Sequence, residues 1–199
     1  MILQRIVDLM EMGLNATGKT FTDIKICELG DQRMKWHPAG TGKRWCLQQG
    51  ASEHVSIDLN GKHGALRIDL SKPVDKWKNY FDMTTNYGTA EHVDGGIYEC
   101  YHNIHNFTKA NSPMIHAGPI AGGCPWHSPY HYKPTFFKEI ARINGYKLIL
   151  EEERVVPGRK KNQKPIDRTL LCAVLIKIND KPFMNKKEFV SMNLIEGLD

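Results

Sequence analysis

Acidic side chains stand where the chain leaves three predicted strands. Glu28 lies in the stretch ICELGDQ, two residues before Gly30, and Asp58 and Asp69 lie near the ends of the later stretches SIDL and RIDL. The carboxyl ends of neighbouring strands meet at one edge of a doubly wound sheet, where such folds bind nucleotides. A carboxylate there can accept both hydroxyls of a ribose, and a glycine lets the backbone approach the ligand. These residues therefore predict a nucleotide-like ligand.

Histidines in two later stretches, EHVDGG and CPWHSPYHY, are suited to moving protons. An imidazole has a pKa near 6.5 and can take a proton from a hydroxyl or an amine. The candidate catalytic residues are His92, His127 and His131, and the candidate substrate-binding residues are Glu91, Trp126 and Tyr130. The alternative is structural: Glu91 and His92 only begin a helix, and Trp126 only packs its Gly/Pro-rich loop together.

The histidines do not predict a metal site. His127 and His131 have the spacing of adjacent ligands on a helix, but Pro129 lies between them. No third ligand has a matching spacing. We therefore expect no bound metal.

The stretch GLNATGKT, residues 13–20, matches the pattern of a phosphate-binding loop. Such a loop needs a strand before it and a helix that begins at its lysine, because the helix N-terminus holds the phosphate. Here an amphipathic helix precedes Gly13 and a strand follows. The stretch is therefore expected to be a connector, in which Gly13 ends the helix.

The periodicity of apolar residues predicts the elements that must position these side chains. Helices are expected at residues 2–12, 95–109 and 133–146, and strands at 23–29, 54–59, 65–70, 80–88, 112–120, 147–156 and 169–178. Asp94 is expected to cap the second helix, and Pro134 to lie in the first turn of the third. Strands alternating with helices indicate an α/β sheet with parallel strands. The loop between the last two strands is too short for a crossover helix, so they are expected to pair antiparallel.

This order of motifs resembles the class I S-adenosylmethionine (SAM)-dependent methyltransferases of the small-molecule type. The resemblance covers nearly the whole chain, and it rests on ICELGDQ, SIDL, ALRIDL, FDMTTNYGTAEHV and GPIAGGCPWHSPYHYKPTFF. It implies one domain over residues 1–199, with a Rossmann-like, doubly wound, seven-stranded mixed sheet. The implied strand order is 3-2-1-4-5-7-6, with strand 7 antiparallel and a helix at the N-terminus.

The resemblance also implies a cofactor, SAM, and roles for six residues. Those residues are Glu28 and Gly30 at the amino-acid end of SAM, Asp58 at the ribose, Asp69 and Leu70 at the adenine, and Asn86 near the sulfonium. Loop capping by the two aspartates and a turn role for Asn86 are the alternatives. The family's second motif glycine is replaced here by Gln32. This departure favours a second hypothesis, a non-catalytic binding module of the same fold.

Composition limits the partners. The chain has 199 residues, a formal net charge of +5 and five cysteines without a C-x-x-C pair, as expected of a cytoplasmic globular protein. We expect neither a signal peptide nor a membrane span, because charged residues interrupt the N-terminal apolar run and no apolar stretch is long enough. The sequence predicts no oligomeric state.

Nucleic acid is not the expected partner. NYGT stands where DNA amino-methyltransferases carry a proline pair, and GCPW reverses the Pro-Cys order of cytosine-C5 enzymes. The basic stretch RVVPGRKKNQKPIDR leaves RNA or protein methylation as an alternative. The expected reaction is methyl transfer to a hydroxyl or amine of a small molecule, possible acceptors including sugars and other metabolites.

Overall fold

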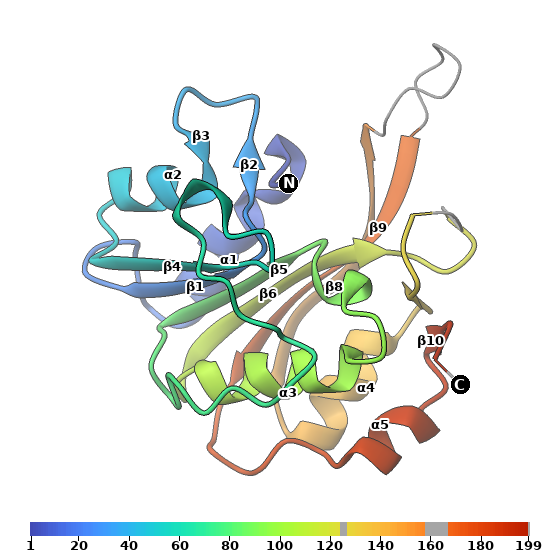
Figure 1. Ribbon diagram of the computed structural model, residues 1–199. Coiled ribbons are helices and arrows are strands. Elements are labelled where there is room, and N and C mark those ends of the chain that lie inside the picture. Colours follow the sequence, from blue (N-terminus) through green and yellow to red (C-terminus); the bar gives the residue numbers. More distant parts are fainter. Residues whose placement is uncertain (124–126, 158–166, 199) are drawn as a thin grey trace.

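A central sheet separates two layers of helices in the computed structural model, which describes residues 1–123, 127–157 and 167–198 (Figure 1). In the order in which they pair, the sheet's strands are β4 (Glu53–Ile57), β1 (Lys25–Leu29), β5 (Met83–Tyr87), β6 (Ser112–Pro119), β9 (Asp167–Lys177) and β8 (Lys147–Pro157). β9 runs antiparallel to both of its neighbours, and the other neighbouring pairs are parallel. The carboxyl ends of β4, β1, β5 and β6 therefore meet at one edge.

The helices cover both faces of the sheet (Figure 1). α1 (Asp8–Ala16) and α2 (Gly42–Gln48) lie on one face, and α3 (Ile97–Phe107), α4 (Phe136–Asn144) and α5 (Lys186–Ser191) lie on the other. The short elements are η1 (Gln4–Ile6), β2 (Arg33–Met34), β3 (Gly40–Thr41), η2 (Lys62–Gly64), η3 (Ala90–His92), β7 (His131–Tyr132) and β10 (Ile195–Glu196). Among the described residues, no helix is both long and apolar enough to cross a bilayer.

Alternating side chains of β1 supply both cores. Ile26 packs with the α1 and α2 layer, whereas Cys27 and Leu29 pack with the α3 and α4 layer. Side chains on a strand alternate between faces, so Glu28 shares the face of Ile26. A strand that is buried on both faces has a nearly continuous apolar sequence, and this accounts for the pattern ICEL.

The mixed α/β architecture is confirmed, and one predicted strand is corrected. Residues 65–70 form no strand, and within the described part of the chain only an isolated bridge joins Ile57 to Leu66. The sheet thus has six of the seven expected strands among the described residues, and these six follow the expected order. Leu66 is 40% exposed, and no helix lies between it and β5 in that described segment. A parallel edge strand needs such a crossover helix to cover it.

Three predicted helix boundaries were wrong. α1 continues past Gly13, where a Cβ atom would lie 2.8 Å from both Ile115 Cδ1 and Pro113 Cβ, so this glycine allows the helix to pack closely on β6. α3 begins after Gly96 without a side-chain cap, rather than at Asp94. α4 begins at Phe136, beyond Pro134, because Thr135 has a left-handed conformation.

The lysine of the GLNATGKT stretch lies away from the carboxyl edge. Lys19 Nζ donates to Ser112 Oγ at 2.9 Å and pairs with Asp82 at 3.6 Å. Ser112 is the first residue of β6, and Asp82 immediately precedes β5. These contacts place Lys19 at the amino ends of the strands, which is consistent with a connector.

Candidate functional site

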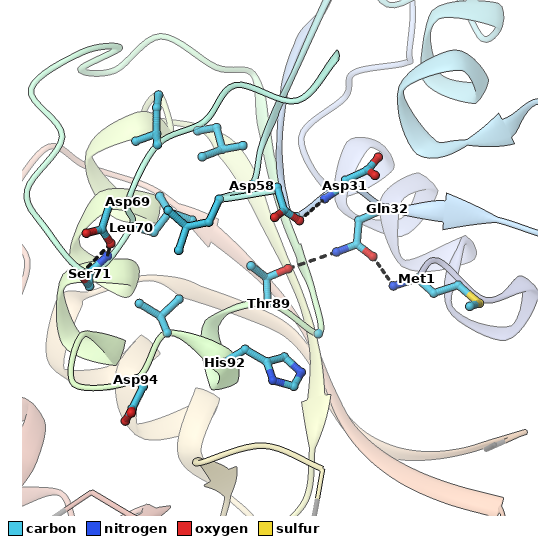
Figure 2. Close-up of a pocket in the computed structure, with 16 residues that line it drawn as sticks. Met1, Asp31, Gln32, Asp58, Asp69, Leu70, Ser71, Thr89, His92 and Asp94 are labelled. Atoms are coloured by element: carbon cyan, nitrogen blue, oxygen red, sulfur yellow. Dashed lines mark hydrogen bonds between the residues drawn. The ribbon is translucent and has the colours of Figure 1, made fainter. Parts of the chain in front are cut away.

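A cavity of about 520 Å³ lies at the carboxyl edge of the sheet, where β1, β4 and β5 end (Figure 2). It is lined by Met1 and by residues 30–32, 57–59, 68–71, 88–89 and 92–94, and we call it the Asp58 cavity. Its volume is in the range of small-molecule sites. Four of the predicted cofactor-binding residues line it: Gly30, Asp58, Asp69 and Leu70.

Gly30 makes the turn that opens this cavity. Its φ is +83°, a left-handed conformation that side chains disfavour, and its amide donates to Ile57 O at 2.7 Å. A Cβ atom at this position would lie 2.5 Å from both Gln32 Nε2 and Thr89 Oγ1. Only glycine therefore fits, and the backbone of the loop is held close to the end of β4.

Asp58 is a half-buried carboxylate that already carries two backbone hydrogen bonds. Its Oδ2 accepts from the Asp31 amide at 2.9 Å (Figure 2). Its Oδ1 accepts from the Asn60 amide at 2.9 Å. Two carboxylate oxygens offer about four lone-pair positions, so each oxygen can accept a further donor. The arrangement fixes the side chain and leaves it able to accept hydroxyl groups.

Asp69 and Leu70 form a polar and an apolar part of the opposite wall. Asp69 Oδ1 accepts from the hydroxyl and the amide of Ser71 at 2.6 and 3.0 Å, and these bonds lower the pKa of Asp69. Leu70 is buried, and Ile57 and Ile68 line the same cavity. The cavity therefore combines carboxylates with an aliphatic surface.

Glu28 and Asn86 do not line the Asp58 cavity in the described structure, contrary to the roles expected of them. Glu28 Oε1 accepts from the Gln32 amide at 3.2 Å and from Ser56 Oγ at 3.1 Å, and burial raises the pKa of Glu28 to about 8. Asn86 Oδ1 accepts from the amides of Thr89 and Ala90 at 3.3 and 3.0 Å. Both residues lie inside strands, and their side chains hydrogen-bond to the backbone of the loops that follow β1 and β5.

Gln32 and Thr89 are site residues to which the sequence assigned no ligand role. Gln32 is 3% exposed, and its Nε2 donates to Leu29 O at 2.9 Å and to Thr89 Oγ1 at 3.1 Å. The Met1 amino group donates to Gln32 Oε1 (Figure 2). The Gln32 side chain thus crosses the loop at the position where the motif expected from the sequence has a second glycine. That departure was the only sequence signal for Gln32, and none marked Thr89.

A second cavity of about 500 Å³ adjoins the first, and we call it the Glu91 cavity. It is lined by Met1, Leu3, Ile6, Tyr87, Gly88, Glu91, His92, Ala117, His127, Pro157, Arg168 and Leu170. Gly88 and His92 line both cavities, so a ligand in one would lie beside a ligand in the other.

Three predicted site residues meet in the Glu91 cavity. Ligand-type atoms of Glu91, His92 and His127 all lie within 4.8 Å of one another, and the two imidazole centroids are 5.0 Å apart. Glu91 is 0% exposed, and burial raises its pKa to about 7. His92 lies at the exposed mouth, and partial burial of its ring lowers its pKa. No metal was expected from the sequence, in which no third ligand has a matching spacing, and these three side chains come from two loops 35 residues apart.

Three other candidates are not placed at either cavity. His131 lies in β7, paired with Glu196 of β10, and is buried. Tyr130 is a core residue whose hydroxyl accepts from the Gly95 amide at 2.9 Å. Neither lines the Asp58 cavity or the Glu91 cavity, because the short β7 returns the chain into the core. Trp126 lies outside the described residues.

Solved structures share this arrangement of sheet and helices. A Bacillus halodurans C-125 protein, provisionally described as a methyltransferase, matches with a TM-score of 0.62 and 8% identity over 87% of this chain and 99% of its own. A Burkholderia thailandensis N1-methyltransferase, crystallised with 1,6-didemethyltoxoflavin and S-adenosylhomocysteine, matches with a TM-score of 0.58 and 12% identity over 88% and 79%. This chain has the class I methyltransferase fold.

The methyltransferase fold by itself does not define a reaction. The [4+2]-cyclase SpnF matches with a TM-score of 0.51 and 14% identity over 73% of this chain and 58% of its own. No family model and no curated protein sequence matches the chain. The function must therefore be argued from the residues of the two cavities.

Proposed function

We propose that this protein is a SAM-dependent methyltransferase that transfers a methyl group to a hydroxyl or amine of a small molecule. The observation that supports this most strongly is the pairing of the Gly30 turn with the Asp58 carboxylate. Both line one cavity at the carboxyl edge of a doubly wound sheet, which is where such sheets bind nucleosides and nucleotides.

The residues of the Asp58 cavity fit the cofactor. Asp58 keeps lone pairs for the two ribose hydroxyls, and Leu70 with Ile68 offers an apolar surface for the adenine. The turn at Gly30 lines the same cavity with backbone alone, which suits the amino-acid end of the cofactor. When bound, SAM supplies a methyl group on a positively charged sulfur.

The Glu91 cavity is the proposed acceptor site. It shares Gly88 and His92 with the Asp58 cavity, so the two ligands would meet at this boundary. In-line methyl transfer depends above all on alignment of the two reacting groups. The pKa of His92 is lowered, which keeps the imidazole neutral at pH 7 and able to take the proton that an acceptor hydroxyl or amine loses.

Titration calorimetry with S-adenosylhomocysteine tests this proposal. We expect one ligand per chain with a Kd on the order of 10 µM. The measurement is made on metal-free protein, so that it reports on the Asp58 cavity alone. An absence of binding at millimolar ligand would contradict the proposal.

A non-catalytic binding module of the same fold is the second candidate, and Gln32 is the residue that favours it. If Gln32 supports the loop, Gln32→Gly removes its bonds to Leu29 O and Thr89 Oγ1, and we expect affinity for S-adenosylhomocysteine to fall about 5-fold. A loop freed by glycine also has more entropy to lose on binding. A gain of affinity in the same titration would instead show that Gln32 obstructs the cofactor, and would favour the binding module.

A further inference from the structure

Glu91, His92 and His127 are brought together by two separate loops. Glu91 and His92 lie in η3, which follows β5, and His127 lies in the loop after β6. Their candidate ligand atoms lie within 4.8 Å of one another. Ligands that are about 2.0–2.2 Å from one ion lie about 3–4 Å apart. Small side-chain rotations would therefore bring all three onto one ion.

The Glu91 carboxyl group is buried without a partner. It is 0% exposed, and neither of its oxygens has a hydrogen-bond partner within the described structure. Met1 and Arg168 line the same cavity, but neither donates a hydrogen bond to Glu91. An unpaired carboxylate is expensive to bury, and buried charges are normally paired or bound to a metal.

The donor set selects a class of ion. Two imidazole nitrogens and one carboxylate oxygen are the ligands of many catalytic zinc sites and of the facial triad that binds Fe²⁺. Mg²⁺ and Ca²⁺ prefer oxygen ligands throughout. A three-ligand site also leaves coordination positions open. Here the cavity of about 500 Å³ lies beside the ligands and can admit a further oxygen ligand.

We propose that Glu91, His92 and His127 form a binding site for a divalent first-row transition metal of the Zn²⁺ or Fe²⁺ type. The remaining coordination positions face the Glu91 cavity and take water or an oxygen of the bound small molecule. Arg168 lines that cavity, and its Nε lacks a hydrogen-bond partner within the described residues, so it is available to an anionic group of the same molecule. Binding of the cofactor is independent of the metal, since none of the three ligands is needed to hold the ribose, whereas a metal on His92 would replace the base role proposed for that residue.

Zn²⁺ and Co²⁺ titrations of chelator-treated protein test the site. We expect one ion per chain with a Kd of about 1 µM or tighter, and a visible Co²⁺ spectrum typical of four- or five-coordination. Glu91→Gln and His127→Ala should each weaken Zn²⁺ binding by at least about 30-fold and remove the Co²⁺ spectrum. His37→Ala removes a histidine outside both cavities and should leave binding unchanged.

Glu91→Gln also reports on folding, because it replaces a buried acid with a neutral group of the same shape. We expect the metal-free variant to unfold at the same urea concentration as the wild type or higher. Loss of metal binding in a folded Glu91→Gln chain supports the site. The site is overturned if the wild type does not bind the metal stoichiometrically, or if Glu91→Gln and His127→Ala bind it as tightly as the wild type. Binding of S-adenosylhomocysteine to metal-free protein is measured separately and tests only the proposed methyltransferase function.

Discussion

Replacement of Asp58 by alanine is expected to weaken binding of S-adenosylhomocysteine by about 100-fold. The carboxylate lines the Asp58 cavity, and each of its oxygens carries one backbone hydrogen bond and has room for another. A hydrogen bond to a charged group contributes roughly 1.5–3 kcal/mol, and two ribose hydroxyls would lose such a partner together. Titration calorimetry on the wild type and on Asp58→Ala measures the effect.

Two further variants separate ligand binding from loop structure. Asp58→Asn keeps an oxygen for one backbone amide but loses the charge. We expect it to weaken binding of S-adenosylhomocysteine by about 10-fold, compared with about 100-fold for alanine. Lys19→Ala changes the amino-terminal edge of the sheet, where Lys19 contacts Ser112 and Asp82, and it should leave binding unchanged. If Asp58→Ala, still folded by circular dichroism, binds within about 3-fold of the wild type, the ribose role of Asp58 is wrong.

The sheet was largely predictable because strand-like runs alternate with helical ones along most of the chain. β5 and β6 lie inside their predicted ranges, and the antiparallel pairing of β8 and β9 followed from the length of the loop between them. Shorter elements gave no periodic signal: α2 spans seven residues, and β2 and β3 span two each. The segment at residues 65–70 has the alternation of a strand. Whether it pairs depends on a covering helix that its own sequence does not contain.

Residues just beyond strand ends were easier to place than residues within strands. Gly30 and Asp58 follow β1 and β4 and line the cavity, as the topology of a doubly wound sheet requires. Glu28 lies within β1, and a strand buried on both faces does not reveal which face a given side chain occupies. The meeting of Glu91 with His127 depends on the course of two loops, which no periodic pattern encodes.

The contribution of Glu28 to the stability of the protein is expected to fall as pH rises from about 5 to about 8. Burial raises the pKa of Glu28 to about 8, whereas a carboxyl in the unfolded chain has a pKa near 4.5. The folded state thus holds a proton that the unfolded state has released. The contribution is fully present below pH 4.5 and is lost as pH rises through about 8.

His54 acts in the opposite direction between about pH 5 and about pH 6.5. Its Nε2 lies 3.7 Å from Glu28 Oε2, which is close enough for an ion pair. Burial, however, lowers the pKa of His54 to about 3, so the folded imidazole is neutral throughout this pH range, whereas the unfolded ring gains a proton below about 6.5. The contribution of His54 to stability therefore rises with pH up to about 6.5, and only the comparison with a variant that lacks the Glu28 carboxyl isolates the effect of Glu28. The contact therefore joins a protonated carboxyl and a neutral ring.

Urea unfolding of the wild type and Glu28→Gln at pH 5.5 and pH 8 measures the contribution. Between these pH values the wild type should lose on the order of 3 kcal/mol more unfolding free energy than the variant, which has no proton to release at this position. Ser56→Ala is the matched control, because it removes a hydrogen bond to the same carboxyl but leaves the carboxyl able to titrate. That variant should be less stable overall and keep the pH dependence of the wild type. If the unfolding free energies of the wild type and Glu28→Gln change equally with pH, Glu28 ionises near its ordinary pKa. The loop that bears Gly30 and Gln32 would then be hydrogen-bonded to an ionised carboxylate.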